Sequence, residues 1–430
     1  MSDSENNFPD SNLKNQFINI KIIKMSKNKY LLPLIVMAAL FFMIGFMTTM
    51  NNSMIDFLKE AFKLDELRNG EVLKQLPNSF FFGAYILSIP VGFLIHRIGY
   101  RNGVLAGLAM LTLGIILCIP LVAIGYIPFL AAVAIFAVGI VILQVVANPY
   151  VNALGPAKTA ASRLTLTNAL NSVATVIAPI FVSMLIISDG ADTGVMEPTQ
   201  VQSPFIILAV ISAVILVVMF LLKLPEIEDD AENQGANEKK YKSSAFKYPH
   251  VWLGSLAIFF YMGIEIGIPS FFADYTKEIG LDLTAAQRTD WLKYYWGGLM
   301  VGRLAGIFIL RKFTARNILT LCAFGGIILV AASLVIGAGS GNVAMVLFLG
   351  TGLFHSIMWP TIYTLALEDL GPLAKVASGV ISTAVIGAAI LTPMMGAIQN
   401  WAGIIAAISC LFIYYIYLMF FAVKGSKIRT

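Results

Sequence analysis

Long apolar runs recur along almost the whole chain, separated by short polar segments. A helix that crosses a bilayer needs about 20 mostly apolar residues, and twelve runs are of that order. We therefore predict spanning helices over the ranges 31–55, 75–96, 103–125, 128–153, 165–187, 204–223, 251–273, 292–311, 315–337, 343–367, 374–398 and 401–423. Helices are expected rather than open sheets, because an open sheet cannot satisfy its backbone hydrogen bonds in lipid.

The polar segments divide these runs into two groups of six. The charged stretch 224–250 separates the groups and is predicted to be a cytoplasmic linker. The expected fold class is an all-α membrane protein with two pseudo-symmetric six-helix bundles, at 30–223 and 251–423. Residues 1–29 are expected to form a disordered cytoplasmic N-terminus, and 424–430 a cytoplasmic tail.

The two halves resemble each other in sequence. The fourth run contains Asn148-Pro149-Tyr150 and is followed by Leu-Gly-Pro at 154–156. The tenth run contains Trp359-Pro360 and is followed by Leu-Gly-Pro at 370–372. A parallel repeat of two six-helix halves is typical of membrane transporters.

Composition supports a membrane location. Hydrophobic residues make up 58% of the 430 residues and charged residues only 12%, with a mean hydropathy of +0.82. A soluble core could not hide that much apolar surface. The formal net charge of +5 is small and no basic stripe occurs, so a nucleic-acid partner is not expected.

The placement of Lys and Arg predicts the orientation. One set of loops carries the basic N-terminus, the central lysines and the basic C-terminal tail, whereas loops such as 188–202 and 337–342 carry no Lys or Arg. Basic loops usually face the cytoplasm. We expect a multi-pass protein of the cytoplasmic (inner) membrane with both termini in the cytoplasm.

Common enzyme and metal patterns are missing from the sequence. The three cysteines and three histidines are far apart, and no metal-ligand spacing, nucleophile motif or P-loop occurs. An enzyme and a metal site are therefore not expected. A membrane-embedded enzyme, the alternative, would need a buried cluster of His, Asp or Glu.

Several motifs carry a resemblance to a known family. The segment from Gly92 to Arg101 resembles the loop between helices 2 and 3 of the major facilitator superfamily. Stronger matches are Leu-Gln-Val-Val-Ala-Asn-Pro-Tyr-Val at 143–151 and Tyr-Tyr-Trp-Gly-Gly at 294–298 with Gly-Arg at 302–303. These resemble the fucose permease and glucose/galactose transporter family. The resemblance covers about residue 30 to the end and implies a twelve-helix, alternating-access carrier of a monosaccharide, expected to act as a monomer in the bilayer.

The chain departs from that family pattern at three positions. Proton-coupled fucose carriers of the family have acidic residues where this chain has Asn52 and Gln144. The usual aspartate of the loop motif is His96. Amides cannot titrate, so these changes put the coupling mechanism in doubt while leaving the sugar class intact.

Polar side chains within the predicted spans are the candidate sugar ligands, because buried polar groups in membranes usually face the bundle interior. Amides both donate and accept hydrogen bonds, as sugar hydroxyls do, and Trp packs on the C–H faces of sugars. The candidates are Gln144, Asn148, Asn168, Asn171, Asn52, Trp296, Trp359 and His355. Hydrogen bonds between helices, and packing or interface anchoring for the aromatic rings, are the alternative roles.

Glu265 is the candidate coupling residue, since it lies deep in the seventh run while other acids fall nearer the ends of their spans. The alternative is a carboxylate that only hydrogen-bonds the sugar or a neighbouring helix. Arg97, Arg101 and Arg303 are predicted gate residues, with snorkelling to the interface as the alternative. No cofactor is expected beyond a coupling ion, a proton or sodium. The expected function is cation-coupled symport of a neutral monosaccharide, namely a hexose, a deoxyhexose or an amino-sugar relative. A sugar uniporter and a transport-deficient sugar sensor are the alternative functions.

Overall fold

The computed structural model describes residues 10–67, 69–153, 160–187, 196–222, 244, 247–368, 370 and 373–427. Within them, all regular structure is helical. The first half contains α1 (Asp10–Ser53), α2 (Ile55–Ala61), α3 (Gly70–Lys74), α4 (Leu76–Gly83), α5 (Ser88–Ile124), α6 (Tyr126–Ala153), α7 (Ala160–Val182) and α9 (Gln202–Leu221). The second half contains α10 (Pro249–Glu278), α11 (Ala285–Lys312), α12 (Ala315–Ile336), α13 (Gly341–His355), α14 (Met358–Ala366), α15 (Ala374–Thr383), α16 (Gly387–Ala402) and α17 (Ile404–Phe420).

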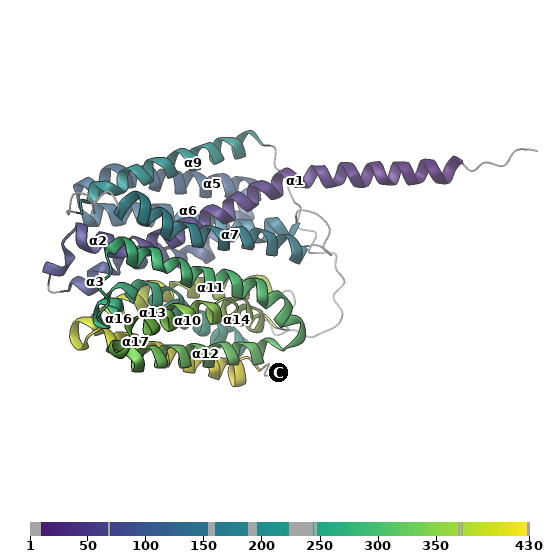
Figure 1. Ribbon diagram of the computed structural model, residues 1–430. Helices are drawn as coiled ribbons and strands as arrows, with labels where there is room; N and C mark the ends of the chain where they lie inside the picture. The colour runs from purple at the N-terminus through teal and green to yellow at the C-terminus, as the bar shows by residue number, and fades with distance from the viewer. Residues whose placement is uncertain are drawn as a thin grey trace, which may run out of the picture.

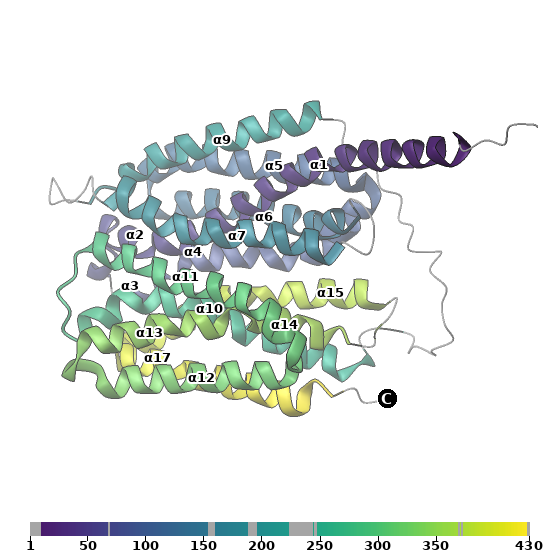
Figure 2. The same ribbon diagram turned by 45° about the vertical axis from the view of Figure 1, so that its right-hand side comes forward.

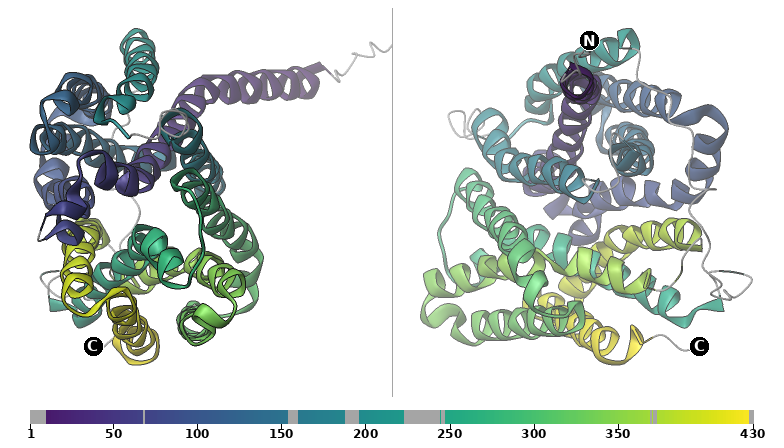
Figure 3. Two further views of the ribbon diagram at one scale, coloured as in Figure 1. Left: turned by 60° about the vertical axis from the view of Figure 1, so that its left-hand side comes forward. Right: turned by 90° about the vertical axis from the view of Figure 1, so that its right-hand side faces the viewer.

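The two halves form two bundles that lie against each other, as Figures 1 and 2 show. Both views along the helices in Figure 3 show the same division into a purple-to-teal bundle and a green-to-yellow bundle. At one end of the bundles lie the start of α1 and the end of the chain; we call this the linker end (Figure 1). At the opposite end lie α2 and α3, and we call it the α2–α3 end. Most of the predicted linker falls outside the described residues.

Eleven segments of the described residues are long and apolar enough to cross a membrane. The helix α11 occupies the place of the predicted eighth span and is 28 residues long. It falls outside that set because it carries charged residues such as Arg288, Asp290, Lys293 and Arg303. With α11 included, the architecture is the predicted all-α fold of two six-helix bundles.

The outward faces of the bundles are apolar. On α9, for example, the side chains of Val210, Val214, Val217, Phe220 and Leu221 are all exposed. Such a continuous apolar surface would be unfavourable in water but suits the hydrocarbon core of a bilayer. The lipid-facing surface and the buried interior of the bundles are therefore both apolar, which explains why no amphipathic pattern dominates the sequence.

The structure differs from the prediction at the N-terminus. Residues 10–29, which were predicted to be disordered, continue the first spanning helix, so that α1 runs over 44 residues. No glycine or proline occurs between Asp10 and Pro33, so nothing in the backbone stops the helix from extending beyond the span. The polar composition that predicted disorder gave no helix-breaking signal.

Close packing of α11 depends on a stripe of glycines. Gly298, Gly302 and Gly306 are spaced four residues apart and face α13 and the junction at 356–357 that follows it, within the second half. A Cβ atom at Gly302 would lie 2.6 Å from the backbone carbonyl oxygen of Leu353, so only glycine allows this approach. Small residues at this spacing let membrane helices pack closely. The stripe fixes the rotation of α11 and so directs the neighbouring Arg303 toward the other half.

Candidate functional site

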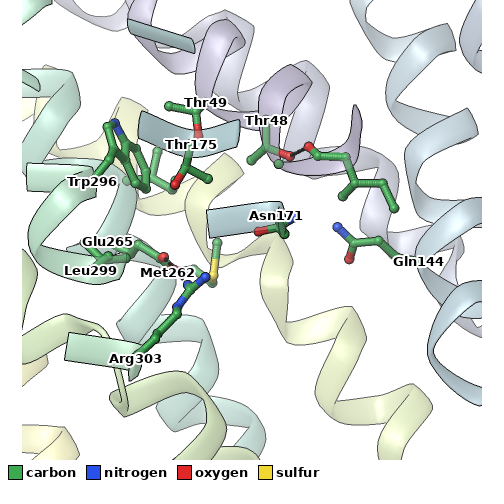
Figure 4. A pocket seen from close by; sticks show the side chains of 13 residues that line it. Thr48, Thr49, Gln144, Asn171, Thr175, Met262, Glu265, Trp296, Leu299 and Arg303 are labelled. Carbon is green, nitrogen blue, oxygen red and sulfur yellow. Dashed lines mark hydrogen bonds and ion pairs between the residues drawn. The ribbon is translucent and has the colours of Figure 1, made fainter. Parts of the chain in front are cut away.

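A cavity lies between the two halves, about midway along the spanning helices (Figure 4). It has a volume of about 120 Å³. One water needs roughly 10–15 Å³ of such space, so the cavity can hold several waters or one small polyol. Five helices line it with Ile44, Gly45, Thr48 and Thr49 (α1), Gln144 (α6), Asn171 and Thr175 (α7), Met262, Glu265 and Ile266 (α10), and Trp296, Leu299 and Arg303 (α11).

Two polar atoms in the cavity wall have no hydrogen-bond partner among the residues that the structure describes. Oγ1 of Thr49 and Nε1 of Trp296 are both buried and lack a hydrogen bond within the structure. Buried polar groups are almost always hydrogen-bonded, so these two groups are available to a bound ligand or water. Trp296 can only donate, whereas a threonine hydroxyl can donate and accept. This pair suits a ligand that carries hydroxyl groups.

Two amides line the cavity and are also tied to the first half. Asn171 donates through Nδ2 to the carbonyl oxygen of Phe41 at 2.9 Å, which joins α7 to α1. Gln144 is hydrogen-bonded to the hydroxyl of Tyr85. Both amides therefore have fixed orientations before any ligand binds, which lowers the entropy cost of binding.

Glu265 and Arg303 provide the two charges of the cavity wall. Oε1 of Glu265 lies 3.7 Å from Nη2 of Arg303, and Figure 4 shows the two side chains pointing toward each other. Arg303 also donates to Oγ of Ser172 at 3.1 Å, which links α11 to the first half. Because the two charges cancel, the wall is neutral overall and favours an uncharged ligand over an anion.

Prolines in α10 and α14 shape this wall. A proline has no N–H, so the carbonyl four residues earlier loses its helical partner. Pro269 frees the carbonyl oxygen of Glu265, which accepts a hydrogen bond from the hydroxyl of Tyr295 at 3.0 Å. Pro360 frees that of Ser356, which accepts one from Nε of Arg303 at 3.4 Å. The freed carbonyls thus help to position the residues that line the cavity.

The same relation occurs in α16. Pro393 frees the carbonyl oxygen of Ala389, and Oγ of Ser79 in the first half donates to it at 2.9 Å. This hydrogen bond joins α4 to α16 across the boundary between the halves. The predicted tenth span forms two helices, α13 and α14, with an interruption near residue 356. Pro360 accounts for this interruption, because it cannot donate a hydrogen bond to the carbonyl of Ser356.

His355 lies behind the cavity rather than in its wall. It is fully buried, with Nδ1 2.8 Å from the hydroxyl of Tyr295 and Nε2 2.5 Å from that of Tyr415. The Tyr295 hydroxyl has one hydrogen and donates it to the backbone carbonyl oxygen of Glu265. Nδ1 of His355 therefore carries its own hydrogen and donates to Tyr295, while Nε2 accepts from Tyr415. In this way His355 holds Tyr295 in place against the backbone of Glu265.

The other predicted residues lie away from this cavity. Asn52 is buried and donates to Oγ of Ser270 at 2.7 Å, Asn168 is exposed, and Trp359 stacks on Tyr363 in its own helix. The side chain of Asn148 lies outside the described residues. Their roles as sugar ligands stay predictions, whereas Gln144, Asn171, Trp296, Glu265 and Arg303 are brought together by the fold.

The predicted gate residues occupy different places. The side chain of Arg97 is exposed at the linker end. Arg101 donates to the carbonyl oxygen of Phe220 at 3.1 Å, a contact within the first half. Arg303 is the one of the three that lines the cavity and contacts the opposite half.

Sequence reasoning missed Thr48, Thr49, Thr175 and Met262 as lining residues. Thr and Met are common in spans, so their type gives little signal. The spacing gives a weak one, because Thr48 and Thr49 lie one helical turn before Asn52 and share its part of α1.

A layer of amides closes the cavity toward the α2–α3 end. Asn52 and Asn78 of the first half both donate to Oγ of Ser270 in α10, at 2.7 Å and 3.0 Å. Asn78 also donates to Oε1 of Gln75 at 3.2 Å. One turn further along lies a cluster of buried charges, with Asp274 of α10 bound to Lys74 of α3.

Replacing Gln144 with alanine tests the cavity. We expect uptake of the substrate to fall several-fold, because loss of the amide leaves a buried partner unpaired, at a cost of about 1–3 kcal/mol. The matched control is Asn342→Ala, which removes an amide from an exposed position outside the cavity and should change uptake by less than about twofold. Initial uptake rates at equal protein amounts measure both. Equal effects at the two positions would contradict the assignment of the cavity.

Comparison with known proteins identifies a family and several relatives of this chain. The sequence model of a family described as the Major Facilitator Superfamily matches residues 37–393. The chain is 38% identical over 408 residues to the glucose/galactose transporter of Brucella abortus, covering 94% of this chain and 96% of the relative. It is 28% identical over 396 residues to the L-fucose-proton symporter of Escherichia coli, covering 87% and 88%.

A solved structure agrees with these sequence relatives. A crystal structure of the E. coli fucose:proton symporter superposes with a TM-score of 0.67 at 25% identity, covering 93% of this chain and all of the other.

Proposed function

The chain belongs to the Major Facilitator Superfamily, and from this premise we propose that it carries a neutral hexose or deoxyhexose across the membrane by alternating access. The observation that carries the proposal is the neutral, polar cavity between the halves, with the unpaired Thr49 Oγ1 and Trp296 Nε1 in its wall. Members of this superfamily are transporters and not enzymes.

Three features support a neutral sugar as the substrate. The cavity wall offers amide, hydroxyl and indole groups, which match the alternating donors and acceptors of sugar hydroxyls. Its two charges neutralise each other, so a sugar acid would meet the Glu265 carboxylate without an unpaired cation. The names of the relatives, glucose/galactose transporter and L-fucose-proton symporter, agree with this class.

We propose that the α2–α3 end faces outward and the linker end faces the cytoplasm. The loops at the linker end are those that carry the excess of Lys and Arg, and such loops usually remain in the cytoplasm. In this orientation the amide layer and the charged cluster shut the cavity off from the outside.

We propose that Glu265 couples transport to a cation. Arg303 contacts the carboxylate of Glu265, Oγ of Ser172 and the freed carbonyl of Ser356. As the halves move, the guanidinium can keep the last two partners while the carboxylate binds a proton or a sodium ion in its place. A uniporter, in which Glu265 only positions Arg303 or the sugar, is the alternative. A transport-deficient sensor is disfavoured because the cavity is built from both halves.

Counterflow in proteoliposomes tests the function. Vesicles preloaded with unlabelled glucose, galactose or fucose should take up the same labelled sugar at least about tenfold faster than protein-free vesicles. Counterflow needs no coupling ion, so it responds to the carrier activity alone. Glucuronate, which matches glucose in size but is an anion, is the control and should exchange slowly. Binding without exchange for every neutral sugar would favour the sensor, and preferred exchange of glucuronate would contradict the neutral cavity.

A further inference from the structure

A cluster of five charged residues lies at the α2–α3 end, and no part of the substrate site uses it. Its members are Asp56, Lys59, Glu71, Lys74 and Asp274; we call it the ion cluster. The exposed Asp65 pairs with Lys59 at the edge of this cluster. We infer that its contacts to Asp274, together with the Arg288–Glu60 pair, form the gate contact that holds the outer path closed and that must break in each transport cycle. This inference rests on the proposed alternating-access function.

The ion cluster stands directly over the cavity. Ile266, Ser270 and Asp274 follow one another at four-residue spacing on α10, so they share one face of the helix. Ile266 lines the cavity, Ser270 belongs to the amide layer and Asp274 belongs to the ion cluster. Successive layers are thus about one helical turn, or roughly 5.4 Å, apart. A solute leaving the cavity toward the α2–α3 end would have to pass both layers.

The contacts of the ion cluster divide into two kinds. Within the first half, Nζ of Lys74 lies 3.5 Å from carboxylate oxygens of both Asp56 and Glu71, and Nζ of Lys59 lies 2.6 Å from Oε1 of Glu71. Across the boundary, Lys74 donates to Oδ2 of Asp274, and Lys59 lies 3.7 Å from Oδ1. The lysines therefore keep partners in their own half when the halves separate.

A second ion pair crosses the boundary close by. Nη2 of Arg288, at the start of α11, lies 3.3 Å from Oε1 of Glu60 in α2. Here the cation belongs to the second half and the carboxylate to the first, the reverse of the Lys74–Asp274 pair. Opposite charge patterns on the two surfaces fix how the halves dock, because a shifted register would bring like charges together.

The chemistry of the ion cluster suits a contact that opens repeatedly. Burial lowers the pKa of the Lys59 ammonium most strongly and Lys74 lowers it further, but Asp274, Asp65 and Glu71 outweigh both and raise the pKa above its ordinary value. Lys59 therefore stays charged. For buried ion pairs, the attraction is largely offset by the cost of removing the charges from water. Separation of the halves restores that hydration, so the closed and open states can be close in free energy.

Unpaired polar atoms mark the same boundary. Oδ1 of Asn52 and Nε2 of Gln75 are buried and form no hydrogen bond with any part of the chain that the structure describes. Both residues belong to the amide layer just below the ion cluster. Entry of water would satisfy these atoms, which lowers the cost of opening. If the boundary between the halves were permanently closed, we would expect both of these atoms to have hydrogen-bond partners.

The test measures access to the boundary between the halves. Ser270→Cys places a near-isosteric thiol under the ion cluster, at a position that is 1% exposed, and Cys322 and Cys410 are replaced by alanine. Asp274→Asn in this background removes the carboxylate charge, and with it the cross-boundary ion pairs to Lys74 and Lys59. Lys74 keeps its ion pairs with Asp56 and Glu71. A membrane-impermeant maleimide is added to intact cells and, separately, to inverted vesicles. We expect Asp274→Asn to raise labelling of the introduced thiol from outside at least about tenfold.

Two controls separate opening from unfolding. Glu71→Gln neutralises a carboxylate of the same cluster whose ion pairs lie within the first half, and it should raise labelling by less than about twofold. The native Cys118, fully buried within the first half, should stay unlabelled in every variant. Unchanged labelling of the introduced thiol in a folded Asp274→Asn protein would overturn the inference, and so would equal labelling in Asp274→Asn and Glu71→Gln.

A second variant decides the case in which Asp274→Asn also exposes Cys118. Arg288→Gln breaks the other cross-boundary pair and leaves the ion cluster intact. Increased labelling of the introduced thiol with Cys118 still protected supports the gate, and unchanged labelling overturns it. Labelling requires no sugar, whereas counterflow does, so a failure of the gate is distinguishable from a failure of the proposed substrate.

Discussion

Arg303→Met is expected to lower the rate of sugar uptake by roughly tenfold to a hundredfold. The substitution leaves the buried carboxylate of Glu265 without its cation and the freed carbonyl of Ser356 without its donor. Breaking a fully buried ion pair from one side costs about 3–5 kcal/mol. Because the Arg303 side chain is 31% exposed, we expect a smaller cost of about 1.5–3 kcal/mol, and each 1.4 kcal/mol corresponds to a factor of ten. Initial uptake rates and counterflow in proteoliposomes measure the effect at equal amounts of folded protein.

The control for this prediction lies in the same helix. Lys293 pairs with Asp290 at 2.6 Å, but both side chains are substantially exposed, and an exposed pair contributes only about 0–1 kcal/mol. Lys293→Met should therefore change uptake by less than about threefold. Uptake near the parent level in Arg303→Met would show that the Glu265–Arg303 pair has no part in transport.

Removing both charges separates binding from coupling. The double variant Glu265→Gln with Arg303→Met leaves no unpaired charge and should recover counterflow at least about tenfold over Arg303→Met alone. If Glu265 carries the coupling ion, neither the double variant nor Glu265→Gln will accumulate sugar against a gradient, even where exchange is retained. Accumulation in Glu265→Gln would exclude Glu265 as the coupling site. Loss of exchange as well would assign Glu265 to sugar binding.

The second large effect is expected at Gly396, where α16 packs on the backbone of α3. A Cβ atom at this position would lie 2.4 Å from the carbonyl oxygen of Glu71, and a backbone atom cannot move aside as a flexible side chain can. Gly396→Ala should therefore prevent the halves from closing at the α2–α3 end. Overpacking costs typically about 1–3 kcal/mol, so we expect uptake to fall by about tenfold to a hundredfold. The thiol of Ser270→Cys should also become accessible in the labelling assay.

Gly379→Ala is the matched control for Gly396→Ala. It adds the same methyl group on α15 in the same predicted span, where the nearest atom is Cγ1 of Ile89 in the first half at 3.9 Å. That is an ordinary contact, so uptake should stay within about twofold of the parent. A Gly396→Ala protein that transports normally would show that α16 and α3 need not approach this closely.

Much of the fold could be predicted from hydropathy. A bilayer requires apolar helices of nearly fixed length, so the runs in the sequence locate the spans with little ambiguity. The exceptions have local causes. The predicted tenth span divides near residue 356 because Pro360 lies inside it, and α1 extends back to Asp10 because no residue stops it.

The candidate site was predictable only in part. Gln144, Asn171, Trp296 and Glu265 were selected as polar or aromatic residues inside spans, and all four line the cavity. Arg303, which also lines it, was predicted as a gate residue. The same criterion also selected Asn168, Trp359 and His355, which lie elsewhere. Hydropathy gives the depth of a residue in the membrane but not the direction in which it points, and direction depends on the rotation of each helix against its neighbours.

Two features follow from the residues alone: the chain is a two-bundle membrane protein, and certain backbone carbonyls are free, because each proline inside a span removes a helical hydrogen bond four residues earlier. Which side chains bind those carbonyls depends on how the helices pack: Tyr295 donates to Glu265, Arg303 to Ser356 and Ser79 to Ala389. The same packing brings Asp274 to Lys74 across 200 residues. Such pairings arise from the docking of whole helices, whose geometry is a property of both packed surfaces and of no single segment.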